Sequence, residues 1–428
     1  MTTAPAASAS VTADPAALPF DPARIAADHG TPTWVYDASV IEQRIAEVQD
    51  FDTVRYAQKA NSNLALLTLM RKRGVVVDAV TAGELYRAQQ AGYRLGSDEV
   101  VYTADLFDDD ALALIRQHRI PVNVGSPDMI RQLADAGIDV PITLRINPGF
   151  GHGHSQKVNT GGDLSKHGIW HTQIPDCLAD ARAHGLTVRG LHMHIGSGAD
   201  FEHLAQVCDA MLEAARIFTQ HADSLTTISA GGGLPIPYHK DQPQRIDLPR
   251  YFQRWDQTRQ KIAQLAGRDI HLEVEPGRYL VAESGYLLTQ IRSVKQSGQH
   301  HYLVIDAGFN DLVRPSFYGA YHHISVVARG QPADEQRDYI VAGPLCESCD
   351  VFTQKDGGFV TTRRLPVAGA GDWLILHDAG AYGMAMSSNY NSRRLAAEVL
   401  LHQGHTHLIR RRQPVESLTQ FESIPQDL

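Results

Sequence analysis

The feature that most constrains the fold of this chain is a regular alternation of short β-rich runs with amphipathic stretches between residue 38 and about residue 280. The amphipathic stretches, such as residues 64–72 and 201–218, repeat apolar residues at spacings of three and four, which predicts helices. Runs rich in branched and aromatic residues predict eight strands, at residues 54–57, 75–80, 100–103, 121–124, 142–146, 188–194, 225–230 and 270–275. This alternation predicts an α/β fold, a (β/α)8 TIM-type barrel over residues 38–280. The pattern alone leaves a doubly wound open sheet as the main alternative.

The rest of the chain has a different pattern. From residue 281 to residue 428, strand-like runs are separated by Gly, Pro and polar turns with little helical periodicity, which predicts a mainly β C-terminal domain. Residues 20–37 are expected to add a strand to this domain, because TPTWVYD precedes the first helix of the barrel. Residues 1–19, rich in Ala, Pro, Ser and Thr, are expected to form a disordered tail.

The composition limits the partners of the chain. Its 428 residues include 39 Lys and Arg against 48 Asp and Glu, a net charge of -9, which argues against a nucleic-acid-binding protein. No apolar run reaches the roughly 18–20 residues that a membrane-spanning helix needs. Four cysteines are too few for a disulfide framework, and the N-terminus lacks the basic start and apolar segment of a secretory signal. We therefore expect a cytoplasmic protein that does not contact a membrane.

Polar residues follow several predicted strands, at the face of the barrel where such folds carry their chemistry. Lys59 follows the first strand, and His194 ends the sixth. Gly231–Gly233 follow the seventh strand, and Glu275 ends the eighth. Glycine-rich loops at this face allow main-chain N–H groups to approach a phosphate. A phosphate-bearing cofactor together with Lys59 suggests pyridoxal phosphate, whose aldehyde forms a Schiff base with a lysine amine.

A group of histidines leaves a second interpretation open, a zinc hydrolase. His192 and His194 form an H-x-H on one strand, so both side chains point to one face, as in barrel enzymes that hold zinc with two histidines. His152 and His154 could join them. Glu275 suits this interpretation poorly, because it offers a single carboxylate beside an arginine.

The motif CESC at residues 346–349 suggests half a zinc site or a redox pair. A zinc site needs a second ligand pair at matching spacing, whereas Cys177 and Cys208 stand alone on helical stretches. A redox C-x-x-C is expected to open a helix after a strand, and this one lies in the predicted β domain. We therefore interpret the spacing of the two cysteines as a coincidence.

Seven motifs, in order along residues 20–428, resemble the diaminopimelate decarboxylase family. These are fold type III pyridoxal-phosphate enzymes, related to alanine racemase and eukaryotic ornithine decarboxylase. The motifs are YAQKAN (56–61), GLHMHIGSG (190–198), SAGGG (229–233), EPGR (275–278), DAGFNDLVRPSFYG (306–319), GPLCESCD (343–350) and GAYGMAMSSNYNSR (380–393). Residues 147–170 further resemble one bacterial subtype of the family.

The resemblance implies a role for each matched residue. Lys59 would be the Schiff-base lysine, Glu275 would hold the protonated pyridine nitrogen, and His194 would stack on the ring. The phosphate of the cofactor would be surrounded by Ser197, Gly232, Gly233, Gly277, Arg278 and Tyr382. The carboxylates of the substrate would be bound by Arg278, Arg314, Tyr318 and Tyr382, and its distal ammonium by Glu347. Cys346, contributed by the partner subunit of a homodimer, would protonate the carbanion. No metal is implied.

The activity that the resemblance implies is decarboxylation of meso-2,6-diaminopimelate at its D-centre to L-lysine and CO2, the last step of lysine biosynthesis. A substrate with two carboxylates and two ammonium groups needs both arginines and an acid. A decarboxylase or racemase of another basic amino acid stays open, and Arg314 discriminates, because a simple diamino acid has no distal carboxylate. A non-enzymatic pyridoxal-phosphate carrier is the remaining alternative, but such proteins lack a β domain with the Cys346 loop.

Two positions depart from the family pattern. Cys349 stands where the family usually has glycine, so we expect the loop conformation to be affected and a Cys346–Cys349 disulfide to be a route to inactivation. Arg394 stands where the subtype has proline, with little expected consequence. Asp78 and Arg145 are expected to support the site, and residues 165–167 to form a loop near it.

Overall fold

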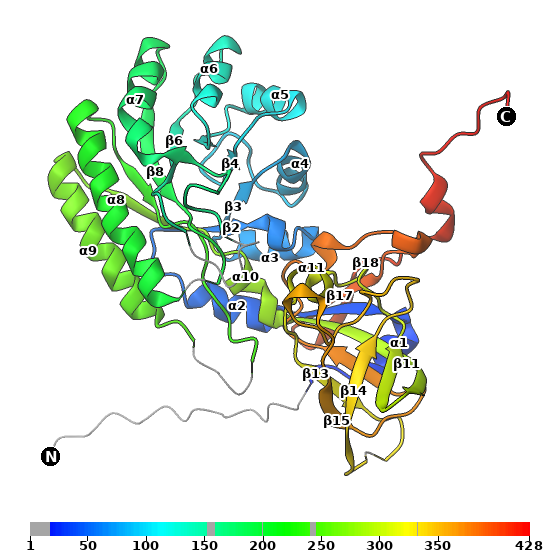
Figure 1. Cartoon of the computed structure of the whole chain (residues 1–428). Coiled ribbons are helices and arrows are strands. Elements are labelled where there is room, and N and C mark those ends of the chain that lie inside the picture. The colour runs from blue at the N-terminus through cyan, green and yellow to red at the C-terminus, as the bar shows by residue number, and fades with distance from the viewer. Residues whose placement is uncertain (1–17, 152–158, 199, 240–244, 332) are drawn as a thin grey trace, which may run out of the picture.

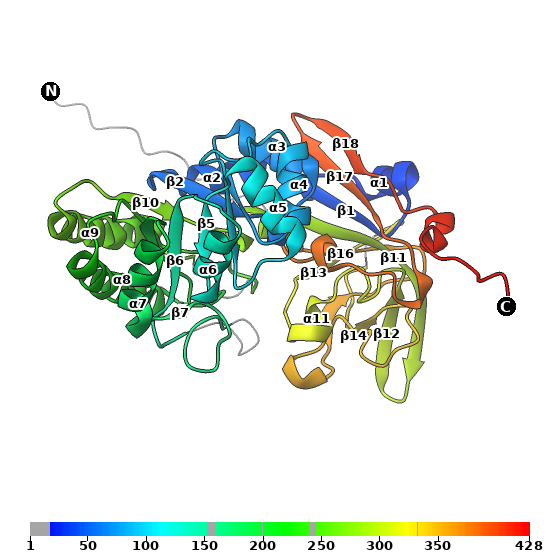
Figure 2. The same ribbon diagram turned by 90° about the horizontal axis from the view of Figure 1, so that it is seen from above.

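The computed structural model describes residues 18–151, 159–198, 200–239, 245–331 and 333–428. The expected tail at residues 1–19 lies almost wholly outside the described residues, and so do His152 and His154. Within the described part of the chain, no helix is long and apolar enough to cross a membrane. A barrel and a domain built on a mixed sheet lie side by side (Figures 1 and 2).

Eight parallel strands form a closed barrel, because the path from β5 through β10 to β6 is completed by direct β5–β6 pairing. Each of the eight predicted strands corresponds to one barrel strand, so the (β/α)8 prediction is confirmed and the open-sheet alternative is wrong. The barrel strands are β2 (Thr53–Ala57), β3 (Val76–Ala79), β4 (Val100–Ala104), β5 (Val122–Val124), β6 (Ile142–Asn147), β8 (Val188–Met193), β9 (Thr227–Ser229) and β10 (His271–Val274). A two-residue strand that the sequence pattern does not predict, β7 (Ile169–Trp170), pairs with the end of β6.

Helices pack around the outside of the barrel, and side-chain caps define where several of them begin (Figure 1). The side chain of Asn63 accepts a hydrogen bond from the N–H of Ala65 (2.9 Å) and so starts the helix that follows the Lys59 turn. The helices of the barrel are α2 (Ala38–Ala46), α3 (Leu64–Lys72), α4 (Ala82–Gln90), α5 (Asp109–His118), α6 (Asp128–Asp135), α7 (Ile174–Ala183), α8 (Phe201–His221), α9 (Leu248–Ala266) and α10 (Arg278–Val281). Two further helices, α1 (Pro22–His29) and α11 (Arg314–Tyr318), lie in the C-terminal domain.

The C-terminal domain is a mixed sheet organised on one long strand, β11 (Gly285–Ser297), which pairs with β1, β12 and β16. Strand β1 (Thr33–Asp37) precedes the barrel in sequence and lies between β11 and β17. The remaining strands are β12 (His300–Ile305), β13 (Ile324–Val327), β14 (Gln336–Ala342), β15 (Arg363–Pro366), β16 (Trp373–Leu376), β17 (Ala397–His402) and β18 (His405–Arg410). The predicted β-rich C-terminal domain is therefore confirmed.

Buried polar contacts join the barrel to this domain. The carboxylate of Glu398 on β17 is fully buried and accepts hydrogen bonds from Tyr36 Oη (2.8 Å) and Asn63 Nδ2 (2.9 Å). Arg410 forms an ion pair with the same carboxylate. A carboxylate buried in this way must be paired, so the contact fixes α3 against the sheet.

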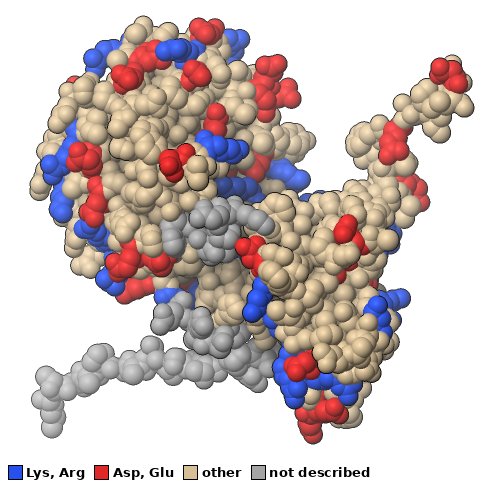
Figure 3. All heavy atoms as spheres, viewed as in Figure 1, with Lys and Arg blue, Asp and Glu red and all other residues tan. Residues whose placement is uncertain are grey.

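Two arginines of the basic run at residues 410–412 are held by other parts of the chain. Arg410 is paired with the buried carboxylate of Glu398, and Arg412 donates to the main-chain carbonyls of His29 (3.2 Å) and Pro32 (2.6 Å). Elsewhere, acidic and basic side chains are interspersed over the face of the molecule seen in Figure 3.

Candidate active site

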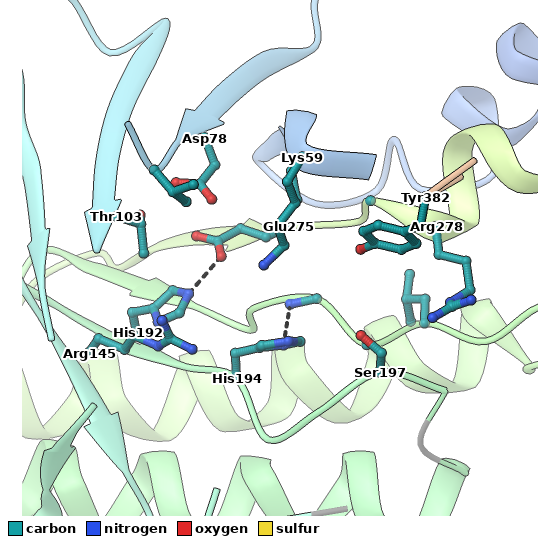
Figure 4. A pocket seen from close by; sticks show the side chains of 16 residues that line it. Lys59, Asp78, Thr103, Arg145, His192, His194, Ser197, Glu275, Arg278 and Tyr382 are labelled. Atoms are coloured by element: carbon teal, nitrogen blue, oxygen red, sulfur yellow. Dashed lines mark hydrogen bonds and ion pairs between the residues drawn. The ribbon is translucent and has the colours of Figure 1, made fainter. Parts of the chain in front are cut away.

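The nine residues predicted to bind the cofactor line one cavity at the C-terminal face of the barrel. Lys59 reaches this cavity from a single 3-10 turn, Gln58–Ala60, that directly follows β2. Its side chain is exposed, and its amine points into the same space as the Glu275 carboxylate (Figure 4). The other members are His194, Ser197, Gly232, Gly233, Glu275, Gly277, Arg278 and Tyr382. The cavity therefore unites an amine, a carboxylate and an imidazole with a glycine-rich loop.

Glu275, at the end of β10, is 6% exposed and held from two sides. Its carboxylate accepts hydrogen bonds from His192 Nε2 (2.6 Å) and from Ser229 Oγ (3.1 Å). Burial by itself would raise the pKa of Glu275, but His192 and Arg55 outweigh it and lower the pKa to about 2. The site thus contains a fixed, ionised carboxylate.

The ring of His194 is oriented by the glycine loop. The N–H of Gly232 donates to His194 Nδ1 (3.2 Å), which leaves Nε2 as the protonated nitrogen. Burial, and then the charges of Lys59 and Arg145, hold the pKa of His194 well below its usual value. A neutral, flat imidazole therefore lines the cavity across from Lys59 (Figure 4).

Asp78 and Arg145, expected to support the site, both line the cavity. Burial and the nearby Glu275 raise the pKa of Asp78 to about 6. Arg145 lies 3.9 Å from Asp105, whose other oxygen lies 2.5 Å from His167 Nδ1. The loop at residues 165–167 is thereby connected to the rim of the cavity, as its position in the sequence suggests.

One end of the cavity is suited to an anion. The main-chain N–H groups of Gly233 and Gly277 make no hydrogen bond to any described residue, and Ser197 lies beside them. A Cβ at residue 233 would lie 2.5 Å from a main-chain oxygen, so only glycine allows this approach. The guanidinium of Arg278 lies over the ring of Tyr382 (5.2 Å to the centroid), which has a left-handed backbone (φ 57°).

A second cavity adjoins the first, and Lys59, Arg278, Tyr318 and Tyr382 line it together with Arg314. Arg278 and Arg314 are 7% and 2% exposed, and neither forms an ion pair with a carboxylate of the described residues. Tyr238 lies between them: its hydroxyl accepts from Arg278 (2.7 Å), and its ring lies 4.9 Å from the Arg314 guanidinium. Two buried cations without a counter-charge create a site for anionic groups.

Cys346 and Glu347 are not brought into either cavity of their own chain. Both are exposed, and the N–H of Cys346 donates to Asn391 Oδ1 (2.9 Å). The carboxylate of Glu347 accepts from the N–H of Ser348 (2.8 Å) and from the hydroxyl of Tyr390 (3.4 Å). A group that contacts either side chain must therefore approach the exposed surface of this loop.

Cys349 does not distort its loop, contrary to the expectation from the missing glycine. It is not among the described residues with positive φ, so its position does not require glycine. Its carbonyl accepts hydrogen bonds from Val351 N (2.8 Å) and Ser316 Oγ (2.7 Å), which any side chain permits. Cys346 and Cys349 are free thiols.

The H-x-H motif does not converge on a metal position. His192 directs Nε2 to Glu275, whereas His194 uses Nδ1 to accept from the glycine loop. The described residues contain no group of three or more His, Cys, Asp or Glu side chains arranged to hold a metal ion. The interpretation of His192 as a zinc ligand is replaced by its contact with Glu275.

The barrel with its lysine, carboxylate and anion-binding end is that of a pyridoxal-dependent decarboxylase. The family model described as pyridoxal-dependent decarboxylase, pyridoxal binding domain, matches residues 38–282. The diaminopimelate decarboxylase of Escherichia coli K12 is 52% identical over 404 residues, covering 93% of this chain and 95% of that protein. The chain belongs to the diaminopimelate decarboxylase family.

Solved structures agree with this assignment. A crystal structure of a diaminopimelate decarboxylase matches with a TM-score of 0.90 at 52% identity, covering 93% of this chain and 95% of that one. A diaminopimelate decarboxylase from M. jannaschii, in complex with L-lysine, matches with a TM-score of 0.86 at 29% identity over 96% of each chain.

Pyridoxal phosphate is the cofactor of this family, and the residues fit it. The free N–H groups of Gly233 and Gly277 suit phosphate oxygens, the Lys59 amine suits an aldehyde, and the ionised Glu275 suits a protonated ring nitrogen. Residues that sequence reasoning missed are Thr103 in the cavity wall and Tyr238 and His322 around the arginines. Thr103 ends the strand predicted at residues 100–103 but lies in no recognised motif, and Tyr238 and His322 lie outside both the predicted strand ends and the motifs.

Proposed function

We propose that this protein decarboxylates meso-2,6-diaminopimelate at its D-centre to give L-lysine and CO2. The observation that carries the proposal is the pair of buried guanidiniums, Arg278 and Arg314, beside the cavity that contains Lys59. A substrate with an amine next to one carboxylate and a second carboxylate further away would neutralise both cations. Simple diamino acids have no group for Arg314.

The residues of the barrel would divide the chemistry. Bound pyridoxal phosphate supplies an aldehyde that combines with an amine and a ring that accepts the electrons released as CO2 leaves. Lys59 would hold the aldehyde of the cofactor through Nζ. Glu275 would keep a proton on the ring nitrogen by its negative charge, and His194 would hold the ring flat from one face.

The remaining residues would bind and orient. Ser197, with the N–H groups of Gly233 and Gly277, would hold the phosphate, together with Arg278 and Tyr382. Gly232 would contribute by fixing the ring of His194 rather than through a free N–H. Arg314 and Tyr318 would receive the distal carboxylate of the substrate. Arg278 and Tyr382, which line the same cavity, would also contact a substrate carboxylate.

The site would be completed by a second copy of the chain. Cys346 and Glu347 are exposed and line neither cavity of their own chain, which supports a homodimer in which each subunit supplies this loop to the other. Glu347 of the partner subunit would bind the distal ammonium, and the partner subunit's Cys346 would return a proton to the substrate carbon. We place the enzyme in the cytoplasm, where its four free thiols stay reduced.

The substrate is tested by measuring CO2 release from meso-diaminopimelate, L-lysine and L-ornithine with the purified enzyme. We expect release from meso-diaminopimelate alone. Borohydride reduction should fix the cofactor on the peptide that contains Lys59, and the Lys59→Arg variant should carry no label. Release from lysine or ornithine at a comparable rate would contradict the proposed substrate.

The shared site is tested by mixing two inactive variants, Lys59→Ala and Cys346→Ala, after dissociation and reassociation. Random pairing gives half heterodimers, each with one intact site, so about a quarter of wild-type activity should return. If both residues act within one chain, the mixture stays inactive. An inactive mixture in which mass analysis finds heterodimers would therefore disprove the shared site.

A further inference from the structure

Arg314 is a buried cation whose neighbours do not supply a negative charge. It is 2% exposed at the start of α11, and no described carboxylate forms an ion pair with it. Burial lowers the pKa of Arg314, and the like charge of Arg278 lowers it further, whereas Tyr238 raises it. A guanidinium in this setting needs neutral hydrogen-bond acceptors to fix its direction.

His322 is such an acceptor, and its hydrogen bonds define its tautomer. His322 Nδ1 lies 2.9 Å from the carbonyl oxygen of His377, and its Nε2 lies 2.9 Å from Arg314 Nη1. A carbonyl oxygen can only accept, so Nδ1 carries the proton. A guanidinium can only donate, so Nε2 presents its lone pair. Both contacts form together only if the imidazole is neutral.

The groups that face His322 reinforce this state. His322 is 2% exposed, with Arg314 on one side and His377 on another. The rings of His322 and Tyr238 pack edge to face, with their centroids 5.6 Å apart. Burial and the charge of Arg314 hold the pKa of His322 well below its usual value, and Arg278 and His377 act in the same direction. Protonation would replace a hydrogen bond with two adjacent cations.

We propose that His322 is a positioning residue for substrate recognition: as a neutral acceptor it fixes Arg314 in the direction that receives the distal carboxylate. This inference rests on the proposed function, since it assigns a specificity role within that site. His322 sits outside both cavities and acts through Arg314 alone, so it affects affinity for dicarboxylates and not the bond-breaking step. A side chain that offers an acceptor at the position of Nε2 substitutes for it.

The test compares His322→Leu, which removes the acceptor, with His322→Gln, which places an amide oxygen near the position of Nε2. A hydrogen bond to a charged group contributes about 1.5–3 kcal/mol, so His322→Leu should raise KM for meso-diaminopimelate roughly 10- to 100-fold with kcat within about threefold. His322→Gln should recover most of this loss. The matched control is His323→Leu, one residue along the chain, whose ring packs on His377 at 5.0 Å; its KM should not change.

A double-mutant cycle separates positioning from a general structural effect. In the background of Arg314→Met, the further change His322→Leu should leave KM unaltered, because nothing remains to be positioned. The affinity of the holoenzyme for pimelate, an unreactive dicarboxylate, can be measured by calorimetry. It should fall in His322→Leu, recover in His322→Gln and stay unchanged in His323→Leu. Additive effects of the two changes, or a fall in kcat with unchanged KM, would overturn the inference.

The two proposals fail in different ways. If the wild-type enzyme binds pimelate through Arg314 and His322 but releases no CO2 from meso-diaminopimelate, the proposed function is wrong and the positioning role stands. If the wild type is active and His322→Leu retains its KM, the positioning role is wrong and the proposed function stands.

Discussion

Replacing Glu275 by glutamine should leave the site folded and remove most of its catalytic power. Glutamine keeps the shape: its carbonyl oxygen can accept from His192, and its amide N–H can donate to the hydroxyl oxygen of Ser229, so the main loss is a negative charge. A carboxylate about 4 Å from a protonated ring nitrogen, at an effective dielectric constant of about 20, contributes about 4 kcal/mol. The expected loss is therefore about 100- to 1000-fold in kcat.

The loss should not depend on pH in the working range. The pKa of Glu275 is lowered to about 2 from its usual 4.5, so its contribution to stability is present above pH 4.5 and is lost only as pH falls through 2. Between roughly pH 7 and pH 9, above the titration of Asp78, both the kcat ratio and the difference in unfolding free energy between wild type and Glu275→Gln should stay constant.

The strand that carries Glu275 offers its own control. Glu273 lies two residues earlier on β10 at the opposite end of the barrel, where it forms two hydrogen bonds with Arg55 (3.0 and 3.1 Å). Glu273→Gln also removes a charge from this strand and should lower the melting temperature without changing kcat. The assay is CO2 release with the cofactor absorbance recorded on the same samples. Retention of more than a third of kcat in Glu275→Gln, or an equal loss in Glu273→Gln, would refute the reasoning.

Three further predictions, which use four variants, test other parts of the structure. Burial and the neighbouring Glu275 raise the pKa of Asp78 to about 6, so this carboxyl contributes stability below its ordinary pKa of 3.8 that is lost as pH rises through 6. The free energy of unfolding in urea of the Asp78→Asn apoenzyme should thus equal that of wild type near pH 4. Above pH 6 it should be higher than that of wild type by up to about 3 kcal/mol. A difference that does not change with pH would contradict this. Cys346→Ser should lower kcat about 100-fold or more, as expected for loss of a general acid, whereas Cys349→Gly should leave kcat unchanged. Gly380→Ala should destabilise the enzyme by about 2–3 kcal/mol in thermal unfolding, because the added Cβ would lie 1.9 Å from a main-chain oxygen.

The barrel could be predicted from the sequence because its strands and helices alternate with clear periods over more than two hundred residues. The hairpin of β17 and β18 is harder, because it carries the half-buried His402 and the exposed His405 and His407, which break the apolar alternation. Strand β7 consists of Ile169 and Trp170 alone, too short to show any period.

The site was predictable to the extent that its residues end barrel strands. Lys59 and Glu275 follow β2 and β10 directly, so the fold class alone brings them together. The role of His192 depends on a contact with a residue 83 positions away, and sequence pattern cannot choose between a core histidine, a metal ligand and a partner for Glu275. Tyr238 contacts Arg278 within the barrel, but its ring also packs on Arg314 and His322 of the other domain, and no local pattern encodes that contact.

The left-handed residue Tyr382 has a consequence for how this enzyme can be recombined. Its N–H donates to the carbonyl of Ala60 (2.8 Å), so the C-terminal domain holds the turn that carries Lys59. In a chimaera that joins this barrel to the C-terminal domain of a distant relative, the segment equivalent to residues 380–383 must therefore still contact the Lys59 turn, in addition to a compatible covalent joint. A mismatch there should yield a protein that folds but leaves its lysine misplaced, which makes this short segment the practical limit on exchanging modules within the family.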